Sequence, residues 1–120
     1  MKKLFTLILV IGGLSLHAQS FYQKFSVKDY AKKQTEKIQS ALDLSDTQAK
    51  EVFQANTLKA HSIKKYLLLY ENRGTLNGLT MKEAIKSVEK DADQASGFTE
   101  SMQKILGADL YEKYLEKFKK

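Results

Sequence analysis

The acidic cluster EKDAD, with Glu89, Asp91 and Asp93, is the first group of side chains in this sequence that could do chemistry. On a helix, Glu89 and Asp93 share a face because they are four residues apart, and a hard cation could visit them. No loop backbone supplies the further oxygen ligands that such a cation needs. The chain has no Cys and, beyond the N-terminal segment, only His61. Softer metals need more ligands of these kinds. We therefore predict no metal site and no cofactor, and interpret the cluster as a solvated helix face.

Catalytic side chains are equally sparse. His61 and Ser62 are adjacent in the sequence, but adjacent positions of a helix point in different directions, so they do not form a nucleophile with its base. The sequence has neither a glycine-rich phosphate loop nor a nucleophile elbow. We therefore predict a protein that is not an enzyme and has no catalytic residues.

Lysines with aromatic neighbours are the remaining candidates for a functional surface. Such a surface attracts an acidic, partly unfolded chain through its charge and then holds apolar patches weakly. The candidates are Phe21, Tyr22, Phe25, Lys28, Lys32, Lys33, Lys59, Lys64 and Lys65. Two other interpretations stay open: the lysines are ordinary helix exterior, and the three aromatic residues pack down as an N-terminal strap.

The N-terminus has the three-part layout of a secretory signal peptide over residues 1–18. Two lysines precede an apolar run, residues 4–16, and the small residue Ala18 follows. We predict cleavage after Ala18, export to the periplasm and no membrane-spanning segment in the mature protein. An uncleaved anchor is the alternative. A lipoprotein anchor would need a Cys, which the sequence lacks.

The predicted mature chain, residues 19–120, has 102 residues and forms a single helical domain. The full chain carries 20 Lys and Arg against 14 Asp and Glu, and loss of the two signal-peptide lysines leaves 18 against 14, a net charge of +4. This mild charge does not demand a nucleic-acid partner, and we predict none for an exported protein. Without Cys or Pro, the domain must be held by packing alone, which helices do best.

Apolar residues recur at spacings of three and four over four segments, which predicts four helices. The segments are residues 26–43, 46–72, 80–106 and 108–120. Residues 73–79 form a turn, and Thr80 with Glu83 forms a capping box at the start of the third helix. Gly97 weakens that helix by about 1 kcal/mol relative to Ala. Gly107 breaks or kinks it.

These lengths predict an all-α fold: a long antiparallel helical hairpin with two shorter flanking helices. The breaks at 44–45 and 107 fall at one end of the hairpin, so the first and last helices fold back along it. A flat arrangement of this kind leaves apolar surface open, which predicts a cradle-like homodimer or a surface for a partner.

The stretch LDLSDTQ, residues 42–48, marks a helix start. Ser45 at the N-cap and Gln48 form a capping box. Asp46 lies at the positive end of the helix, and Leu44 packs into the corner between the two helices that meet there. A direct ligand role for Gln48 is the alternative. The stretch resembles the LTxxQ motif of the periplasmic Spy/CpxP family, with Ser45 where the family usually has Thr.

A second copy of this motif would lie at residues 106–110, LGADL. This chain has Gly107 and Leu110 where the family has a hydroxyl residue and a glutamine. The following YEKYLEKF, residues 111–118, is similar to the end of many small exported members from Gram-negative bacteria. The resemblance covers most of residues 26–120 at the level of helix order.

The resemblance implies an all-α exported protein that forms cradle-shaped antiparallel dimers. Such proteins bind unfolded or partly folded envelope proteins without ATP, or regulate envelope-stress signalling. We therefore expect a periplasmic chaperone-like or stress-response protein. The alternative is a non-enzymatic module that docks to one envelope partner. Weak metal binding, as in some relatives, is a third hypothesis.

Overall fold

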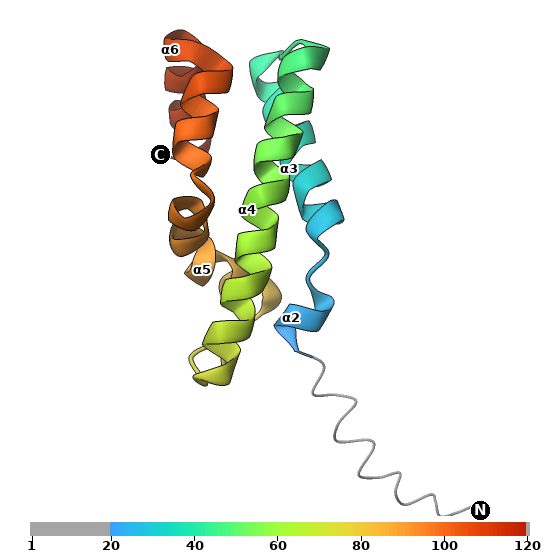
Figure 1. Ribbon diagram of the computed structural model, residues 1–120, viewed down its shortest axis with the longest axis vertical. Helices are drawn as coiled ribbons and strands as arrows, with labels where there is room; N and C mark the ends of the chain where they lie inside the picture. The colour runs from blue at the N-terminus through green and yellow to red at the C-terminus, as the bar shows by residue number, and fades with distance from the viewer. Residues whose placement is uncertain (1–19, 120) are drawn as a thin grey trace, which may run out of the picture.

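The computed structural model describes residues 20–119, so the predicted signal peptide, residues 1–18, lies outside the described residues. Within 20–119 the protein is all-helical and has no strand. The helices are α2 (Phe21–Lys24), α3 (Val27–Leu42), α4 (Asp46–Asn72), α5 (Met81–Ser96) and α6 (Phe98–Phe118), as Figure 1 shows.

Local hydrogen bonds explain where the two longest predicted segments begin. At the start of α4, the Gln48 amide donates to Ser45 Oγ at 3.1 Å, and the Ser45 amide donates to Gln48 Oε1 at 3.3 Å. At the start of α5, the Glu83 amide donates to Thr80 Oγ1 at 3.1 Å, and the Thr80 amide donates to Glu83 Oε1 at 2.9 Å. Each capping box satisfies two amides that a helix start leaves free.

Two glycines divide the second half of the chain. The helix expected over residues 80–106 is two helices, because Gly97 adopts a left-handed conformation with φ 67° and ψ 29° between α5 and α6. Gly97 therefore ends α5 instead of only weakening it, since a residue without Cβ takes up this conformation freely. Gly107, with φ 80° and ψ 172°, interrupts α6 as expected. The one-turn helix α2 has no counterpart among the expected helices.

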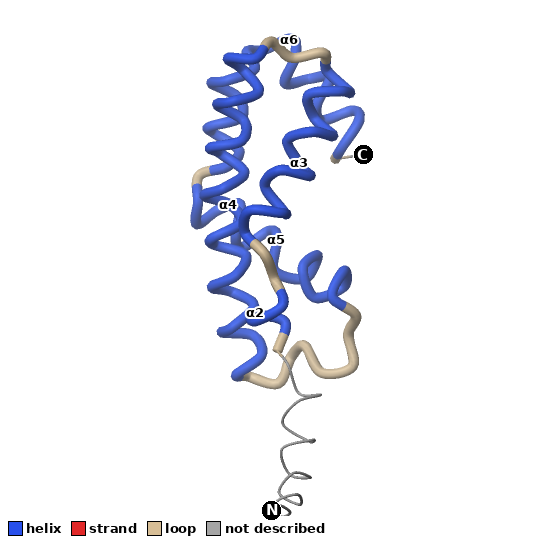
Figure 2. The backbone as a smooth tube through the Cα atoms, turned by 90° about the vertical axis from the view of Figure 1, so that its right-hand side faces the viewer, coloured by secondary structure: helices blue, strands red, loops and turns tan. Residues whose placement is uncertain are grey.

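Helix α4 is the central element and contacts each of the other four helices. It packs along α3 and along α5, while α6 continues from α5 towards the far end of α4 and then turns back at Gly107 (Figures 1 and 2). We call residues 108–118 of α6 the return segment. The turn at 43–45 and the elbow at Gly107 lie at one end of the molecule, and the 73–80 connection lies at the other (Figure 2).

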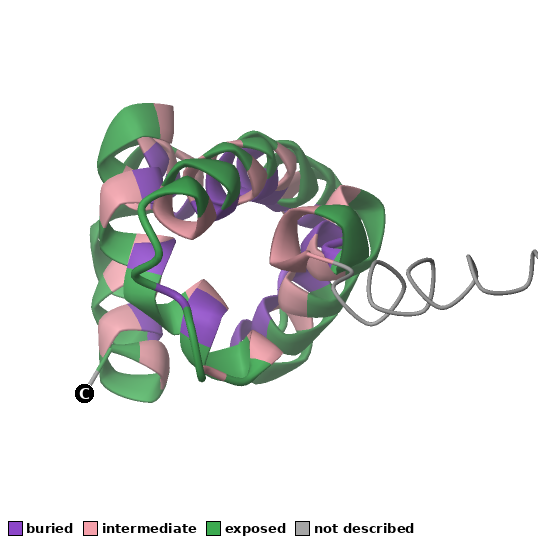
Figure 3. Cartoon of the chain, turned by 90° about the horizontal axis from the view of Figure 1, so that it is seen from below, coloured by how far each residue is buried: buried purple, intermediate pink, exposed green. Residues whose placement is uncertain are grey.

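Buried residues lie on the inward-facing sides of the helices (Figure 3). Their side chains form two separate clusters. The elbow core lies near Gly107 and the turn core near the 73–80 connection. The elbow core consists of Ile38, Leu42, Leu44, Val52, Ala55, Phe98, Met102, Leu106 and Tyr114. The turn core consists of Phe25, Ala60, Ile63, Leu67, Leu76, Ala84, Val88 and Ala92.

Candidate functional site

The three aromatic candidates at the start of the chain form a strap that is tied to α4. The Glu71 carboxylate accepts hydrogen bonds from the amides of Phe21 and Tyr22, at 2.7 and 3.2 Å. Lys64 Nζ donates to the carbonyls of Tyr22 and Phe25, at 2.6 and 3.0 Å. Phe25 is only 5% exposed and belongs to the turn core. Phe25 and Lys64 therefore serve the docking of the strap, and Phe25 offers no surface to a partner.

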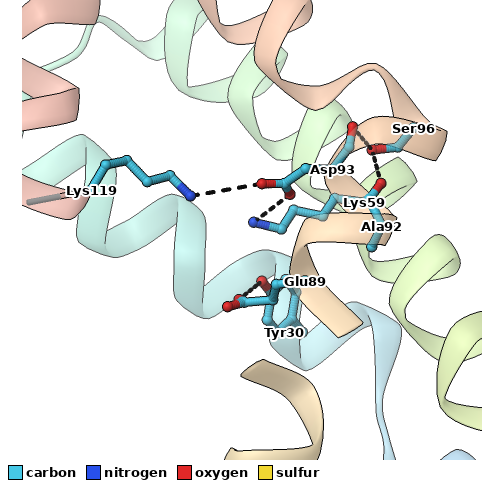
Figure 4. Close-up of polar contacts among 7 residues, drawn as sticks. All are labelled: Tyr30, Lys59, Glu89, Ala92, Asp93, Ser96 and Lys119. Atoms are coloured by element: carbon cyan, nitrogen blue, oxygen red, sulfur yellow. Dashed lines mark hydrogen bonds and ion pairs between the residues drawn. The ribbon is translucent and has the colours of Figure 1, made fainter. Parts of the chain in front are cut away.

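Lys59 also differs from the expected exposed position. It is 5% exposed, and its ammonium lies 2.9 Å from Asp93 Oδ1 (Figure 4). The same ammonium lies 4.5 Å from the centre of the Phe98 ring. Lys119 Nζ approaches Asp93 Oδ2 at 3.8 Å. The ion pair with Lys59 compensates the buried Asp93 Oδ1, which has no other hydrogen-bond partner among the described residues. A buried charge needs such a partner, which accounts for the inward position of Lys59.

Polar and charged side chains lie between the two cores. We call Lys59, Asp93 and Lys119, together with Tyr30 and Glu89, the polar waist. Tyr30 Oη donates to Glu89 Oε2 at 3.0 Å, and Asn56 Nδ2 donates to Thr35 Oγ1 at 3.1 Å (Figure 4 shows the first bond). Burial raises the pKa of Tyr30, and the charge of Glu89 raises it further. Burial likewise raises the pKa of Tyr114, which also feels the charge of Asp93. Both phenols therefore stay neutral at ordinary pH.

A groove between α3 and α5 brings together residues that the sequence separates by about fifty positions. Its volume is about 610 Å³, within the range of roughly 300–1,000 Å³ typical of ligand sites. We call it the α3–α5 groove. Its lining residues are Tyr30, Lys33, Gln34 and Lys37 from α3, with Met81, Lys82, Ile85, Lys86 and Glu89 from α5.

The α3–α5 groove combines an apolar floor with positive charge. Tyr30, Met81 and Ile85 are partly buried and pack against the turn core. The four lysines of the lining are exposed, two on each helix, and Glu89 is the single carboxylate among the lining residues. Four ammonium groups against one carboxylate give the groove a surplus of positive charge over an apolar surface, and the Glu89 carboxylate also accepts the hydrogen bond of Tyr30.

Of the lysines expected on a common surface, Lys33 lines the α3–α5 groove. Lys28 and Lys32 are exposed on α3 but are not part of the lining, and Lys65 is exposed on α4. The structure therefore does not gather the expected lysines into one surface. It separates them among the groove, the strap, the waist and the outside of the helices.

Several groove residues were not predicted from the sequence. They are Lys37, Lys82 and Lys86 and the apolar side chains of Tyr30, Met81 and Ile85. One signal was present: in MKEAIK, Met81 and Ile85 are four residues apart, and a lysine follows each of them. Four-residue spacing places each pair on one side of a helix. The facing wall of the groove comes from α3, which this local pattern cannot reveal.

The residues of the LSDTQ stretch act at the helix corner. Leu44 is buried in the elbow core, and Gln48 Oε1 is engaged by the amide and the hydroxyl of Ser45, each at 3.3 Å. Asp46 is exposed in the first turn of α4. These contacts give Leu44, Ser45 and Gln48 a structural role, and the position of Asp46 suits the positive end of the helix.

No family model, curated protein or solved structure matches the chain. In the part of the chain from 20 to 119, no helix is both long and apolar enough to cross a bilayer. The same residues contain no group of three or more His, Cys, Asp or Glu side chains placed to hold a metal ion. Function is therefore inferred from the α3–α5 groove.

Proposed function

We propose that this protein binds partly unfolded, acidic segments of other proteins in the α3–α5 groove, without ATP, as a chaperone-like or stress-response protein of the periplasm. The observation that carries the proposal is the combination of four exposed lysines with an apolar floor in one groove. A polypeptide with carboxylates beside apolar side chains satisfies both features at once.

The mechanism is electrostatic capture followed by weak apolar contact. Lysines at a groove edge raise the rate of encounter with an acidic chain, and this effect falls with salt. Each exposed ion pair contributes only about 0.2–1 kcal/mol, and the floor is small. Binding is therefore weak and reversible, as a chaperone that works without a nucleotide cycle requires.

The location and family assignment rest on other parts of the sequence. The signal-peptide layout of residues 1–18 and the resemblance of LSDTQ to the LTxxQ motif support a periplasmic protein of the Spy/CpxP type. We include in the proposal the cradle-like homodimer built on a long antiparallel hairpin. Exposed leucines on α4 support a further contact surface, because Leu58 is 57% exposed and Leu68 is 40% exposed.

The second candidate function is a module that docks to one folded envelope partner. Leu58 and Leu69 favour it, because residues eleven apart lie on the same side of a helix and both are exposed. A single partner with a matching apolar patch would cover that side of α4. This function predicts one dominant protein captured from an envelope extract and no general effect on unfolded proteins.

The deciding experiment is light scattering of a chemically unfolded acidic protein that aggregates on dilution, with purified protein added and no ATP. We expect suppression at near-stoichiometric amounts, and loss of suppression in Lys33→Glu/Lys37→Glu. The matched control is Lys28→Glu/Lys32→Glu, which makes the same charge change at the same four-residue spacing on α3 but outside the groove. Absence of suppression by the folded wild-type protein would contradict the proposal and favour the single-partner module.

A further inference from the structure

We infer that the α3–α5 groove takes its bound segment as an amphipathic helix with an apolar stripe and acidic flanks. This inference rests on the proposed function and specifies the conformation and pattern of the segment. Its occupant is part of another protein, not a second copy of this chain.

The return segment shows how this fold closes its own elbow end. Leu110, Tyr111, Leu115 and Phe118 of the return segment pack against the elbow core, and Tyr114 is part of it. These residues repeat at spacings of three and four, so one stripe of a helix faces the core. At the elbow end, a short amphipathic helix therefore covers the surface that α3, α4 and the first half of α6 leave open.

At the turn end, α2 packs on α4, and only α3 and α5 among the helices of residues 20–119 line the α3–α5 groove. The return segment ends beside Asp93, which Lys119 contacts, and Glu89 lies one helical turn earlier on α5 in the groove lining. Beyond that point, α3 and α5 both pack on α4, while Tyr30, Met81 and Ile85 remain only partly buried between them. These side chains form a floor suited to the apolar stripe of one more helix.

The charges of the groove decide which helix fits. Lys33 and Lys37 are four residues apart on α3, and Lys82 and Lys86 are four residues apart on α5. Carboxylates at the same four-residue spacing on both edges of an apolar stripe would meet these ammonium groups one turn after another. Unlike a disordered chain, a helix presents these carboxylates at a fixed spacing.

A second copy of this chain is a poor match for the groove. On the exposed side of α4, Leu58 lies about two turns from Glu51 and two turns from Lys65, so this side offers no net negative charge to a groove lined by four lysines. The return segment has three acidic residues, but Lys113 and Lys117 offset two of them and its apolar stripe already covers the elbow core. Charge complementarity therefore favours a partner that is acidic on both flanks.

The test uses the complete protein and four labelled peptides of about 18 residues, long enough for roughly five helical turns. The first peptide has leucines in a helical stripe with glutamates on both flanks. The second has the same composition in an order without a stripe. The third has a central proline that interrupts the helix. The fourth has lysine in place of glutamate. Fluorescence anisotropy gives each Kd at about 0.15 M salt.

We expect the striped acidic peptide to bind at least tenfold more tightly than the other three. Lys33→Glu/Lys86→Glu should weaken it about tenfold or more, whereas Lys28→Glu/Lys32→Glu should change Kd less than about threefold. Met81→Ser should also weaken binding. Circular dichroism of each variant confirms that the protein is folded.

The remaining outcomes separate this inference from the proposed function. Equal, groove-dependent binding of the striped, shuffled and proline peptides would contradict a helical conformation of the bound segment. It would remain consistent with the chaperone-like function. Suppression of client aggregation without peptide binding would overturn the assignment of this groove to a helix. Failure of both measurements would remove the proposed function as well. Concentration-dependent self-association that the groove variants abolish would show that a second copy fills the groove.

Discussion

The two ends of this molecule differ in whether a further helical segment covers their apolar side chains. At the elbow end, the return segment covers the surface beside α3 and places Tyr114 in the elbow core at 5% exposure. At the turn end, the α3–α5 groove stays open over Tyr30, Met81 and Ile85, and four lysines line it. The chain thus covers the apolar side chains of the elbow end itself, whereas those of the groove stay open between four lysines.

The polar waist is the boundary between the two ends. Lys59, Asp93 and Lys119 form its ion pairs, and Tyr30 with Glu89 forms the bond at the edge of the groove. The Lys59–Asp93 ion pair lies between the two apolar clusters, because a charge cannot enter either cluster without its partner. Each end can therefore be perturbed separately, and the following variants are ordered from the largest expected effect to the smallest.

Tyr114→Ala tests how much the covered elbow core contributes to stability. The Tyr114 ring stacks on Tyr111 and Phe118, with centroid distances of 6.0 and 5.3 Å. We expect a loss of about 3–5 kcal/mol in the free energy of unfolding, because a cavity replaces a buried aromatic ring. Urea unfolding followed by circular dichroism measures it. Ile85→Ala in the open groove should cost only about 1 kcal/mol, and equal losses would mean that the two ends are closed alike.

Asp93→Ala tests the waist. It leaves the ammonium of Lys59 buried without its carboxylate, and we expect a loss of about 3 kcal/mol in unfolding free energy. Lys59→Met combined with Asp93→Ala should recover most of this loss, because an apolar pair needs no compensating charge. Lys119→Ala is the control, since its side chain is 43% exposed and should matter little. A loss under about 1 kcal/mol in Asp93→Ala would show a solvated waist.

Gly107→Ser tests the elbow that directs the return segment. The backbone at Gly107, φ 80° and ψ 172°, lies in a region that residues with a Cβ rarely adopt, and nothing fills the space around a Cβ there. We expect a loss of about 1–3 kcal/mol from backbone strain alone, seen as a lower Tm.

The serine in this variant also restores the hydroxyl residue that the LTxxQ motif would have at position 107. Gly97→Asn is the matched control, because Gly97 has φ 67° and ψ 29°, a left-handed conformation that Asn tolerates. A smaller loss at Gly107 than at Gly97 would contradict the prediction.

Tyr30→Phe tests the edge of the groove and gives the smallest effect at neutral pH. Loss of the hydrogen bond to Glu89 should lower the unfolding free energy by about 1 kcal/mol. The pKa of Tyr30 is raised in the folded state, mainly by burial, so folding keeps the proton that the unfolded chain loses above about pH 10. The corresponding stability is complete below pH 10 and falls as the pH rises further.

The wild-type protein should therefore lose stability above pH 10, by up to about 1.4 kcal/mol per pH unit for each retained tyrosine proton. Tyr30→Phe should show a shallower decline, because only Tyr114 and Tyr70, whose pKa values are also raised, then retain their protons on folding. Urea midpoints between about pH 8 and 11 measure the difference. Parallel declines in the two proteins would show that Tyr30 titrates alike in the folded and unfolded chains.

Much of the helical framework could be predicted from the sequence because its signals are local. The expected segment 46–72 matches α4, Asp46–Asn72, and the expected 26–43 agrees with α3, Val27–Leu42, to within one residue at each end. Ser45 with Gln48 and Thr80 with Glu83 lie three residues apart, so their capping boxes depend on neighbours alone. The end of α5 was missed, because a glycine inside a helix and a glycine that ends one look alike in sequence.

The site was less predictable for a physical reason. Lys33 and Lys59 both appear as lysines on amphipathic helices, yet one lines the groove and the other is buried. The difference comes from Asp93, which lies 34 residues beyond Lys59 in the chain and reaches it only in the folded protein. Spacing rules act within one helix and carry no information about which faces of two helices meet.

By itself, the sequence determined the helical class, the starts of α3, α4 and α5 and the break at Gly107, because these follow from residue periodicity, from hydrogen bonds across a few residues and from the absence of a Cβ in glycine. Only the tertiary structure decided which lysines are paired and which are free, and that Tyr30, Met81 and Ile85 share one open groove. That decision depends on contacts between helices far apart in the chain, where burial makes an ion pair necessary and exposure makes it dispensable.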